Sequence, residues 1–242
     1  SAGLSMRFIW SNLTGNITGA PSARAGTSLT FDLGFYYTKP ILFSGNNSEL
    51  SFGAHLSNIG QKITYSNQDF EDFIPGNLRL GTAFKTNLDA YNSLTFALDF
   101  NKLMVPTPPE YELDENGDFV IDQNGNPVIA NGKDPDRPFI SGTFGSFTDA
   151  PNGFSEEIKE FMISFGVEYW YREVFAFRTG YFWEHQDKGD RKYFTAGLGF
   201  RYQVFGVDFS YLIPQEQGHP LGDTLRLSFI FNLDKQAEAT TL

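Results

Sequence analysis

Residues 175–214 read FAFRTGYFWEHQDKGDRKYFTAGLGFRYQVFGVDFSYLIP, and this stretch decides the expected fold. Apolar residues alternate with polar or small ones through residues 175–183, 194–202 and 205–211. Alternation with period two predicts β-strands, in which successive side chains point to opposite faces. Each strand would therefore present one apolar face and one mixed polar face.

The same alternation recurs on both sides of this stretch. It covers residues 4–10, 29–37, 94–101, 163–171 and 225–233. We count about ten strands, each around ten residues long, which is the length that a tilted strand needs to cross a bilayer. Strands of water-soluble domains more often have about five or six residues. The segment lengths therefore favour a membrane barrel over a soluble sandwich.

Aromatic residues also favour a membrane barrel, because they cluster near the ends of the alternating segments. Their rings suit the boundary between lipid and water, where outer-membrane barrels carry aromatic girdles. The residues in question are Trp10, Tyr36, Tyr37, Tyr169, Tyr171, Trp183, Tyr202 and Tyr211.

The connections between the segments alternate between short and long. The short ones fall at residues 40–47, 88–91, 172–174 and 203–206. The long ones fall at residues 12–25, 60–75, 103–157, 185–190 and 213–223. Alternate connections of an antiparallel barrel lie on the same side, so this sorting predicts short turns on one side and long loops on the other.

The expected fold class is therefore all-β, a transmembrane antiparallel up-and-down β-barrel. We expect a single outer-membrane domain over residues 1–242, with residues 103–157 as a long extracellular loop insertion. Within this loop, Asn116-Gly117 and Asn124-Gly125 predict tight turns and a small projecting hairpin. The Asp and Asn spacing resembles a calcium loop, but the glycine expected at its sixth position is absent, which favours a plain hairpin. Further on, Ser155 is expected to cap a short helix.

Composition excludes several classes of function. The net charge of −11 argues against a nucleic-acid partner, because phosphate binding needs clustered Lys and Arg. The chain has no Cys, and His55, His185 and His219 are scattered, so neither a metal nor a cofactor is expected. No apolar run approaches the ~18 residues of a membrane-spanning helix. The opening SAGLSMRFIW lacks the features of a signal peptide, so we expect the true N-terminus to lie upstream.

The polar face of the predicted sheet carries charges of both signs, which allows two interpretations. They could form cross-strand ion pairs that stabilise a filled interior, or they could line a conduit for water or a ligand. The charged and polar residues assigned to this face are Arg7, Asp32, His55, Arg79, Lys85, Asp99, Glu168, Arg178, Glu184, Arg201, Asp208 and Arg226.

Catalysis would need a nucleophile or base with its partners, and the sequence offers little of this kind. It contains no GxSxG motif. His55 lies near Ser51 and Ser57 in one predicted strand, which we interpret as a coincidence in a serine-rich segment. We therefore expect a non-enzyme.

Several stretches resemble the PorV family, a branch of the FadL-like barrels that serves type IX protein secretion. These stretches are FGAHLSNIGQKITYS (52–66), FIPGNLRLGTAF (73–84), LTFALDFNKLMVPTPP (94–109), GTFGSFTDAPNGFSEEIKE (142–160), VEYWYR (167–172), residues 175–214 quoted above, and HPLGDTLRLSFIFN (219–232). The resemblance implies a barrel of about fourteen strands in the outer membrane of a Gram-negative bacterium. Since about ten strands are counted here, it also implies that N-terminal strands and a plug are missing.

The resemblance further implies a set of partners and no chemistry. The protein would work with the giant translocon barrel of the type IX system and bind the C-terminal signal domains of cargo. It would then carry the cargo to a cell-surface attachment complex that contains a sortase-like peptidase. Outer-membrane lipid would surround the barrel.

Aromatic and apolar residues on the long loops are the candidate partner-binding site, because such side chains on polar loops often mark a protein-binding patch. They are Phe70, Phe73, Ile74, Phe139, Phe144, Phe147 and Phe154. The alternative is that they fold inward and cap the mouth of the barrel. Two other functions stay open: a FadL-like channel for small hydrophobic molecules, and an outer-membrane lipid hydrolase that uses His55 or His185.

Overall fold

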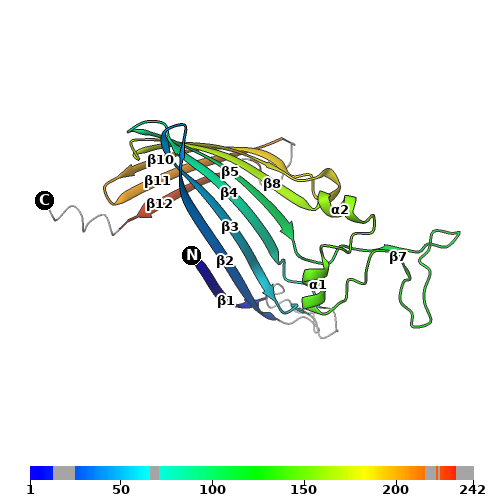
Figure 1. Cartoon of the computed structure of the whole chain (residues 1–242). Helices are drawn as coiled ribbons and strands as arrows, with labels where there is room; N and C mark the ends of the chain where they lie inside the picture. The colour runs from blue at the N-terminus through cyan, green and yellow to red at the C-terminus, as the bar shows by residue number, and fades with distance from the viewer. Residues whose placement is uncertain (13–24, 66–70, 216–221, 223, 233–242) are drawn as a thin grey trace. The chain divides into compact units, whose positions relative to one another are not determined.

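A computed structural model describes residues 1–12, 25–65, 71–215, 222 and 224–232 (Figure 1). Ten strands form one sheet, in the order β1-β2-β3-β4-β5-β8-β9-β10-β11-β12. The first five are β1 (Ala2–Ser11), β2 (Gly26–Phe43), β3 (Asn46–Gly60), β4 (Asn77–Asn87) and β5 (Asn92–Leu103). The others are β8 (Phe161–Tyr171), β9 (Phe175–Trp183), β10 (Lys192–Tyr202), β11 (Phe205–Pro214) and β12 (Leu225–Phe231).

Sheet order follows chain order, which confirms the predicted all-β, up-and-down architecture with ten strands. Every pair whose register is described is antiparallel. Within the described part of the chain, no pairing joins β1 to β12. The described helices are too short or too polar to cross a membrane.

The alternation of the sequence becomes an alternation of exposure. In the β1–β2 pair, Leu4 lies opposite Leu33 and Phe8 opposite Leu29, on one face of the sheet. Leu4 and Phe8 are more than 70% exposed, at 72% and 73%. Thr30, on the other face, is fully buried. Among the described residues only Ile63, Met104, Ala150 and Ala176 are buried hydrophobic side chains. The chain thus inverts the usual pattern, with an exposed apolar face and a buried polar one.

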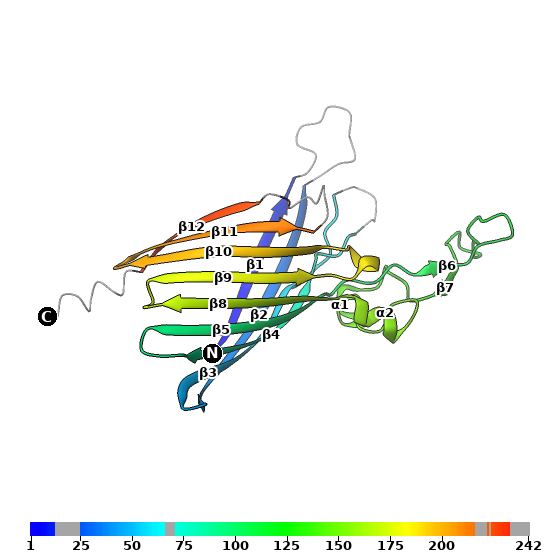
Figure 2. The same ribbon diagram turned by 90° about the horizontal axis from the view of Figure 1, so that it is seen from above.

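The chain divides into two compact units. Unit 1 comprises residues 1–35, 54–79 and 101–161, and unit 2 comprises residues 36–53, 80–100 and 162–242. Strands β2 to β5 contribute residues to both units, whereas β9 to β12 lie wholly in unit 2. Strands β8 to β12 lie side by side in chain order (Figure 2).

Unit 1 contains the whole of the long connection between β5 and β8. It carries the small two-stranded sheet of β6 (Glu110–Tyr111) and β7 (Ile129–Asn131), and the helices α1 (Phe139–Gly145) and α2 (Phe154–Lys159). The two Asn-Gly turns form as predicted, since Gly117 and Gly125 both have φ +86°. They close two successive hairpins through the bridges Leu113–Phe119 and Ile121–Pro127.

Three local expectations were wrong. Strand β2 continues through Pro40 to Phe43, and the turn is Ser44-Gly45, because an extended strand accommodates the φ of proline at the loss of only one donor. Glu184 follows the end of β9 and pairs with Arg191, so it lies in a loop rather than on a strand. Ser155 does not cap α2: the N-cap is Gly153, and the Ser155 hydroxyl donates to the carbonyl of Asn152.

Unit 2 contains the short turns of the sheet. They join β2 to β3, β4 to β5, β8 to β9 and β10 to β11. In an up-and-down sheet these connections share one end, as the sequence predicted. The longer connection from β9 to β10 also lies in unit 2 and contains a 3-10 turn, η1 (Gln186–Lys188).

Candidate functional site

A fully buried lysine anchors the long loop of unit 1. Lys102, near the end of β5, has a completely buried side chain whose Nζ donates to Glu157 at 3.1 Å and also to Glu160. The other oxygen of Glu157 accepts the backbone N–H groups of Asp149 and Ala150, at 2.8 and 2.9 Å. One buried charge therefore ties β5, α2 and the segment after α1 together. Charges are buried in proteins only when they are paired in this way.

Aromatic rings surround this buried lysine. Its Nζ lies 5.4 Å from the ring centroid of Phe147 and 5.8 Å from that of Phe161. The faces of aromatic rings attract cations at these distances. Phe147, one of the predicted partner-binding residues, is half-buried here, and its ring contributes to the anchor of the loop.

One side of α1 packs against the rest of unit 1 through a small residue. Gly142 is buried, and a Cβ at this position would collide with the ring of Phe73 and approach Pro106 at 3.2 Å. Arg137, just before the helix, pairs with the buried carboxylate of Asp149. The glycine lets α1 approach Phe73 closely, and the ion pair fixes the start of the helix.

Helix α1 also forms an apolar groove with the strands of unit 1. The groove has a volume of about 270 Å³. Seven apolar side chains line it, together with Gly60 and Gln61. They are Leu29, Phe31 and Leu33 of β2, Leu56 and Ile59 of β3, and Phe139 and Phe144 of α1. Leu29 and Leu33 belong to the exposed apolar face of the β1–β2 pair, so the groove extends that face.

An irregularity in β3 completes the groove. Asn58 has φ +57°, a left-handed conformation that Asn tolerates better than most residues. Its N–H donates to Asp32 at 2.9 Å, and its side-chain oxygen accepts from Arg7 at 3.1 Å. The alternation is interrupted there, so Leu56 and Ile59, three positions apart, both line the groove.

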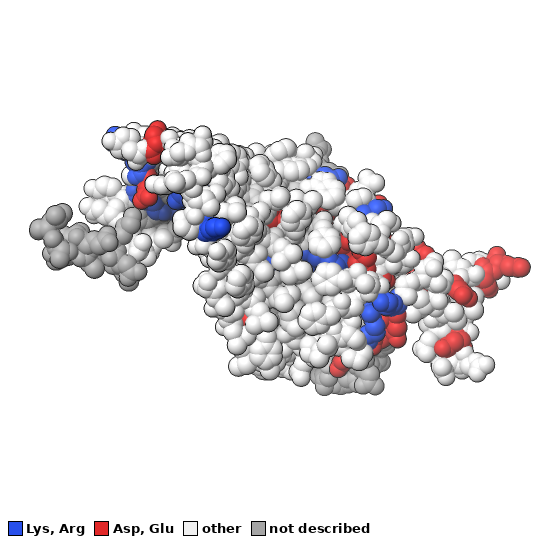
Figure 3. Space-filling model, in the orientation of Figure 1, with Lys and Arg blue, Asp and Glu red and all other residues white. Residues whose placement is uncertain are grey.

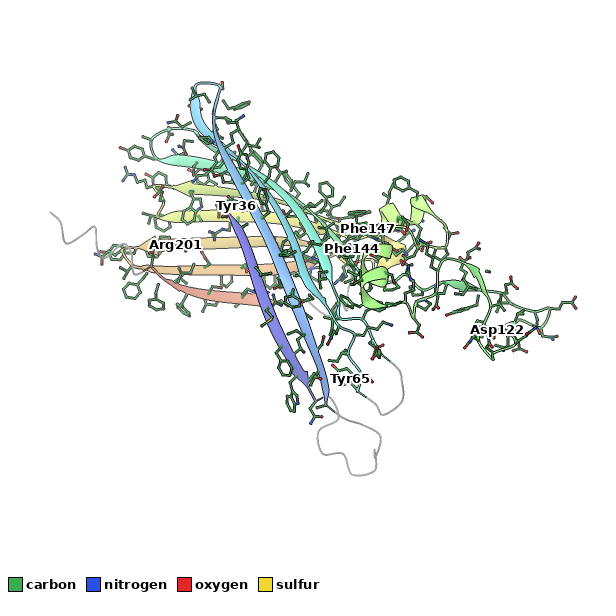
Figure 4. All side chains as sticks on the ribbon, turned by 60° about the horizontal axis from the view of Figure 1, so that its bottom comes forward. Tyr36, Tyr65, Asp122, Phe144, Phe147 and Arg201 are labelled. Atoms are coloured by element: carbon green, nitrogen blue, oxygen red, sulfur yellow. The ribbon has the colours of Figure 1, made fainter. Side chains whose placement is uncertain are left out.

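The predicted partner-binding residues fall into three groups. Phe139 and Phe144 both line the groove. Phe144, which is labelled in Figure 4, lies on α1. Its side chain is 53% exposed. Phe73, Ile74 and Phe147 are half-buried, and Phe73 packs against α1 while lying 4.6 Å from Nζ of Lys62. Phe154 is 79% exposed at the start of α2, apart from the groove lining. Phe70 lies outside the described residues.

Sequence reasoning missed the contribution of the strands to this groove. Leu29, Phe31 and Leu33 belong to the alternating segment 29–37, and nothing in their pattern separates them from other strand residues. The one available signal was Asn58-Ile59-Gly60 inside an otherwise alternating segment, because Asn and Gly within a strand often mark an irregularity.

The polar face of unit 2 carries a ladder of cross-strand ion pairs. Arg178 donates to Glu168 at 2.6 Å and to Asp208 at 2.9 Å, and Arg201 donates to both oxygens of Asp208 at 2.8 Å. The strand between them, β10, has Gly199 at this level, where a Cβ would lie 2.7 Å from Asp208 and 2.9 Å from Arg178. The glycine therefore leaves room for a pair that spans a strand. This confirms the predicted cross-strand pairs.

Beside this ladder, unit 2 has a hollow of about 790 Å³. Small residues such as Ala97, Ser164, Gly166, Gly180 and Gly197 form much of its lining, which explains why the space is not filled. Ion pairs and an open hollow therefore occur on the same face.

Ser51, one of the serines near His55, hydrogen-bonds to two other side chains. The hydroxyl of Ser51 donates to Glu49 at 3.3 Å and accepts from Tyr36 at 3.1 Å. No group of three His, Asp or Glu side chains in the described part of the chain could hold a metal ion.

Comparison with known proteins gives a match to one family model over part of the chain. The family model described as Type IX secretion system protein PorV matches residues 1–110. This match covers β1 to β5 and so includes the strand side of the groove, but neither α1 nor α2. No curated protein matches the chain.

Proposed function

We propose that this chain, whose residues 1–110 match the family model of the type IX secretion system protein PorV, is a non-catalytic outer-membrane shuttle of that system. In this role it binds the C-terminal signal domain of cargo at the giant translocon barrel. It then delivers the cargo to the cell-surface attachment complex that contains a sortase-like peptidase. The match to PorV carries this proposal, and the apolar face and the groove support it.

The exposure pattern supports a place in the outer membrane. Strands β1, β10 and β12 expose large apolar side chains along one face, among them Leu4, Phe8, Leu198 and Phe229. Contiguous apolar surface of this kind is unfavourable in water, whereas lipid covers it at no cost. Strands of ten or eleven residues, such as β1 and β10, match the length that a tilted strand needs to cross a bilayer.

The groove supports protein binding by the long loops. Apolar pockets bounded by aromatic residues are where binding free energy concentrates in protein interfaces. Phe144 combines a place in the groove with exposure to a partner, and Phe154 offers the most exposed ring of the predicted set. All seven predicted residues stay in the proposed contact set, with Phe144 and Phe154 first.

The test is a gentle detergent extraction of the tagged protein from its own outer membrane, followed by mass spectrometry of the proteins that co-purify. We expect a very large barrel protein, or cargo that shares a C-terminal domain. Phe144→Ser and Phe154→Ser should reduce this recovery. Ile121→Ser, at a 51% exposed apolar residue outside the groove, is the matched control and should not. Equal recovery from all variants would remove the loop aromatics from the proposal.

A channel for small hydrophobic molecules is the second candidate, because seven apolar side chains line the groove. A groove of about 270 Å³ exceeds the roughly 150 Å³ cavity that accommodates benzene in an engineered protein core. This function predicts that the protein is extracted without protein partners and loaded with lipid or fatty acid. That result would support the channel and contradict the shuttle proposal.

A further inference from the structure

The short-turn end of unit 2 contains a polar cleft that the proposed function does not use. The cleft has a volume of about 810 Å³. Its lining is rich in side-chain amides, with two cations and two carboxylates. These residues are Asn46, Asn47, Asn87, Asn92, Lys85, Arg172, Asp89 and Glu173, with Gly45, Ala90, Tyr91 and Ser93 completing the wall.

The turn between β8 and β9 holds Arg172 in an unusual conformation. Arg172 and Glu173 have φ +52° and +54°, and the N–H of Val174 bonds to the carbonyl of Tyr171 at 3.0 Å. A two-residue turn with two left-handed residues normally takes Asn-Gly, since side chains such as Arg and Glu disfavour this conformation. Strained residues persist only where their surroundings hold them, and they cluster at functional sites.

Two tyrosines hold the Arg172 side chain. Its guanidinium lies 4.5 Å from the ring centroid of Tyr91 and 5.5 Å from that of Tyr171. Its backbone N–H donates to the carbonyl of Tyr91 at 2.6 Å. A guanidinium that stacks on aromatic faces keeps its N–H edge available and loses little freedom when it binds a planar anion. Arg172 is thus prepared to bind a carboxylate or phosphate.

The two cations share the lining of the cleft with the carboxylates of Asp89 and Glu173, but without a salt bridge among the described residues. Neither Arg172 nor Lys85 forms an ion pair with a described residue. The neighbouring carboxylate of Asp89 is occupied by its own turn, where it accepts the N–H groups of Tyr91 and Asn92 at 2.7 and 2.9 Å. These bonds hold the pKa of Asp89 below its usual value, so it stays charged and keeps Tyr91 in place.

We propose that this cleft binds an extended polypeptide segment that carries a carboxylate. Arg172 takes the carboxylate, with Lys85 as a second cation in the same wall. The amides of Asn46, Asn47 and Asn87 supply the paired donors and acceptors that peptide groups require, which favours a polypeptide over a bare anion. On the proposed outer-membrane placement the short turns face the periplasm, but binding itself does not depend on that placement.

The experiment measures binding of a fluorescent ten-residue peptide with four Glu residues to the purified full chain in detergent. The same peptide with Gln in place of Glu is the control ligand. We expect the Glu peptide to bind at least ~10-fold more tightly, since charge-assisted hydrogen bonds are roughly twice as strong as neutral ones. Its affinity should fall as salt is raised, because the site is open to solvent.

Arg172→Gln and Lys85→Gln should each weaken binding of the Glu peptide, by about 10- to 100-fold and by a smaller factor respectively. Lys85 lies outside the strained turn, so its variant tests the site even if Arg172→Gln disturbs the turn. Lys39→Gln, which removes an exposed charge outside the cleft lining, should leave the affinity unchanged.

Three outcomes would overturn the proposal. The Glu and Gln peptides could bind alike, or Lys85→Gln and Arg172→Gln could both leave the affinity within about twofold, inside the range of surface substitutions. Alternatively, inorganic phosphate could bind with the same dependence on Arg172 while the peptide does not. The cleft would then be a phosphate site and not a polypeptide site.

Discussion

Charged side chains stabilise both units, but their surroundings differ. In unit 1, Lys102 is fully buried between two carboxylates and connects segments 55 and 58 residues apart in sequence. In unit 2, the side chains of Arg178 and Arg201 are 31% and 23% exposed. Their ion pairs join strands that belong to one hydrogen-bonded sheet, either as neighbours or across β10. The long loop therefore depends on a few buried groups, whereas the ladder reinforces a sheet that exists without it. The two successive hairpins of unit 1, closed by the bridges Leu113–Phe119 and Ile121–Pro127, differ from both, because the surface visible in Figure 3 displays acidic but no basic residues there.

The largest expected effect is at the buried cation. Lys102→Met removes the cation that Glu157 and Glu160 share, so the loop should lose about 3–5 kcal/mol of stability, as when one member of a buried ion pair is removed. Hydrogen exchange of residues 139–160, followed by mass spectrometry, would measure this loss.

The control in the same loop is Lys133→Met, because Lys133 is exposed and donates only to Thr148 among the described residues, at 3.0 Å. It should change stability by less than about 1 kcal/mol. Adding Glu157→Gln and Glu160→Gln to Lys102→Met should recover part of the loss, since the carboxylates that had surrounded the cation are then replaced by neutral amides. Equal exchange in the Lys102 and Lys133 variants would contradict the comparison between the two units.

A second substitution tests whether close packing, and not charge alone, holds α1. Gly142→Ala places a methyl group against the ring of Phe73, so it should destabilise unit 1 by about 1–3 kcal/mol, as overpacking does. Alanine is otherwise the better helix former by about 1 kcal/mol, so the sign of the change is informative. Urea unfolding in detergent would measure it. Phe73→Leu should relieve the clash, and Ser141→Ala, on the exposed side of α1, should be neutral.

Removal of a charge from the ion-pair ladder of unit 2 should cost less stability. Asp208→Asn removes the carboxylate that Arg178 and Arg201 share, and the partial exposure of these groups limits the loss to about 1–2 kcal/mol. The urea midpoint would report it. Asp99→Asn is the matched control, because Asp99 lines the same hollow without an ion pair to a described residue. A loss as large as that of Lys102→Met would remove the contrast between the units.

The smallest effect on stability is expected at the two successive acidic hairpins, and it depends on pH. Backbone N–H groups of Asp118 and Asn116 hold the pKa of Asp114 below its usual 3.8, and those of Asn126 and Asn124 do the same for Asp122. A lowered pKa means that the charged form stabilises the turn above the usual value and that this contribution is lost as the pH falls below it. Titration of the carboxyl carbons by NMR should show both values below 3.8.

Asp114→Asn keeps an acceptor oxygen without a titrating group. The first turn of this variant should therefore persist at low pH, while the second still responds through Asp122. If both turns of the unaltered chain persisted unchanged far below the usual pKa, the carboxylates would not be what holds them.

Much of the sheet could be predicted from sequence because its causes are local. Residues 205–211 alternate, so they form a strand with Phe205 and Phe209 on one face, whatever the rest of the chain does. Asn116-Gly117 and Asn124-Gly125 form turns because glycine accepts a positive φ. Pro40 is also a local turn signal, but β2 continues through it to Phe43, and the turn follows at Ser44-Gly45.

The candidate site could be predicted only in part. The aromatic residues of the loops pointed to Phe139 and Phe144, but their neighbours Leu33 and Leu56 come from strands distant in sequence. Likewise Arg172 was recognised as part of a short turn, whereas its contact with Tyr91 needs two separate turns to meet.

The sequence alone determined the strands, their two faces and the sorting of short and long connections, because period-two alternation and turn residues act over a few positions. Only the tertiary structure decided that Lys102 is an internal anchor, that Phe73 supports α1 while Phe144 lines a groove, and that Arg172 stacks between tyrosines. These roles depend on which distant segments come into contact, and a residue type does not specify its distant neighbours. Burial and pairing, which give each charge and each ring its energetic effect, arise only once those contacts form.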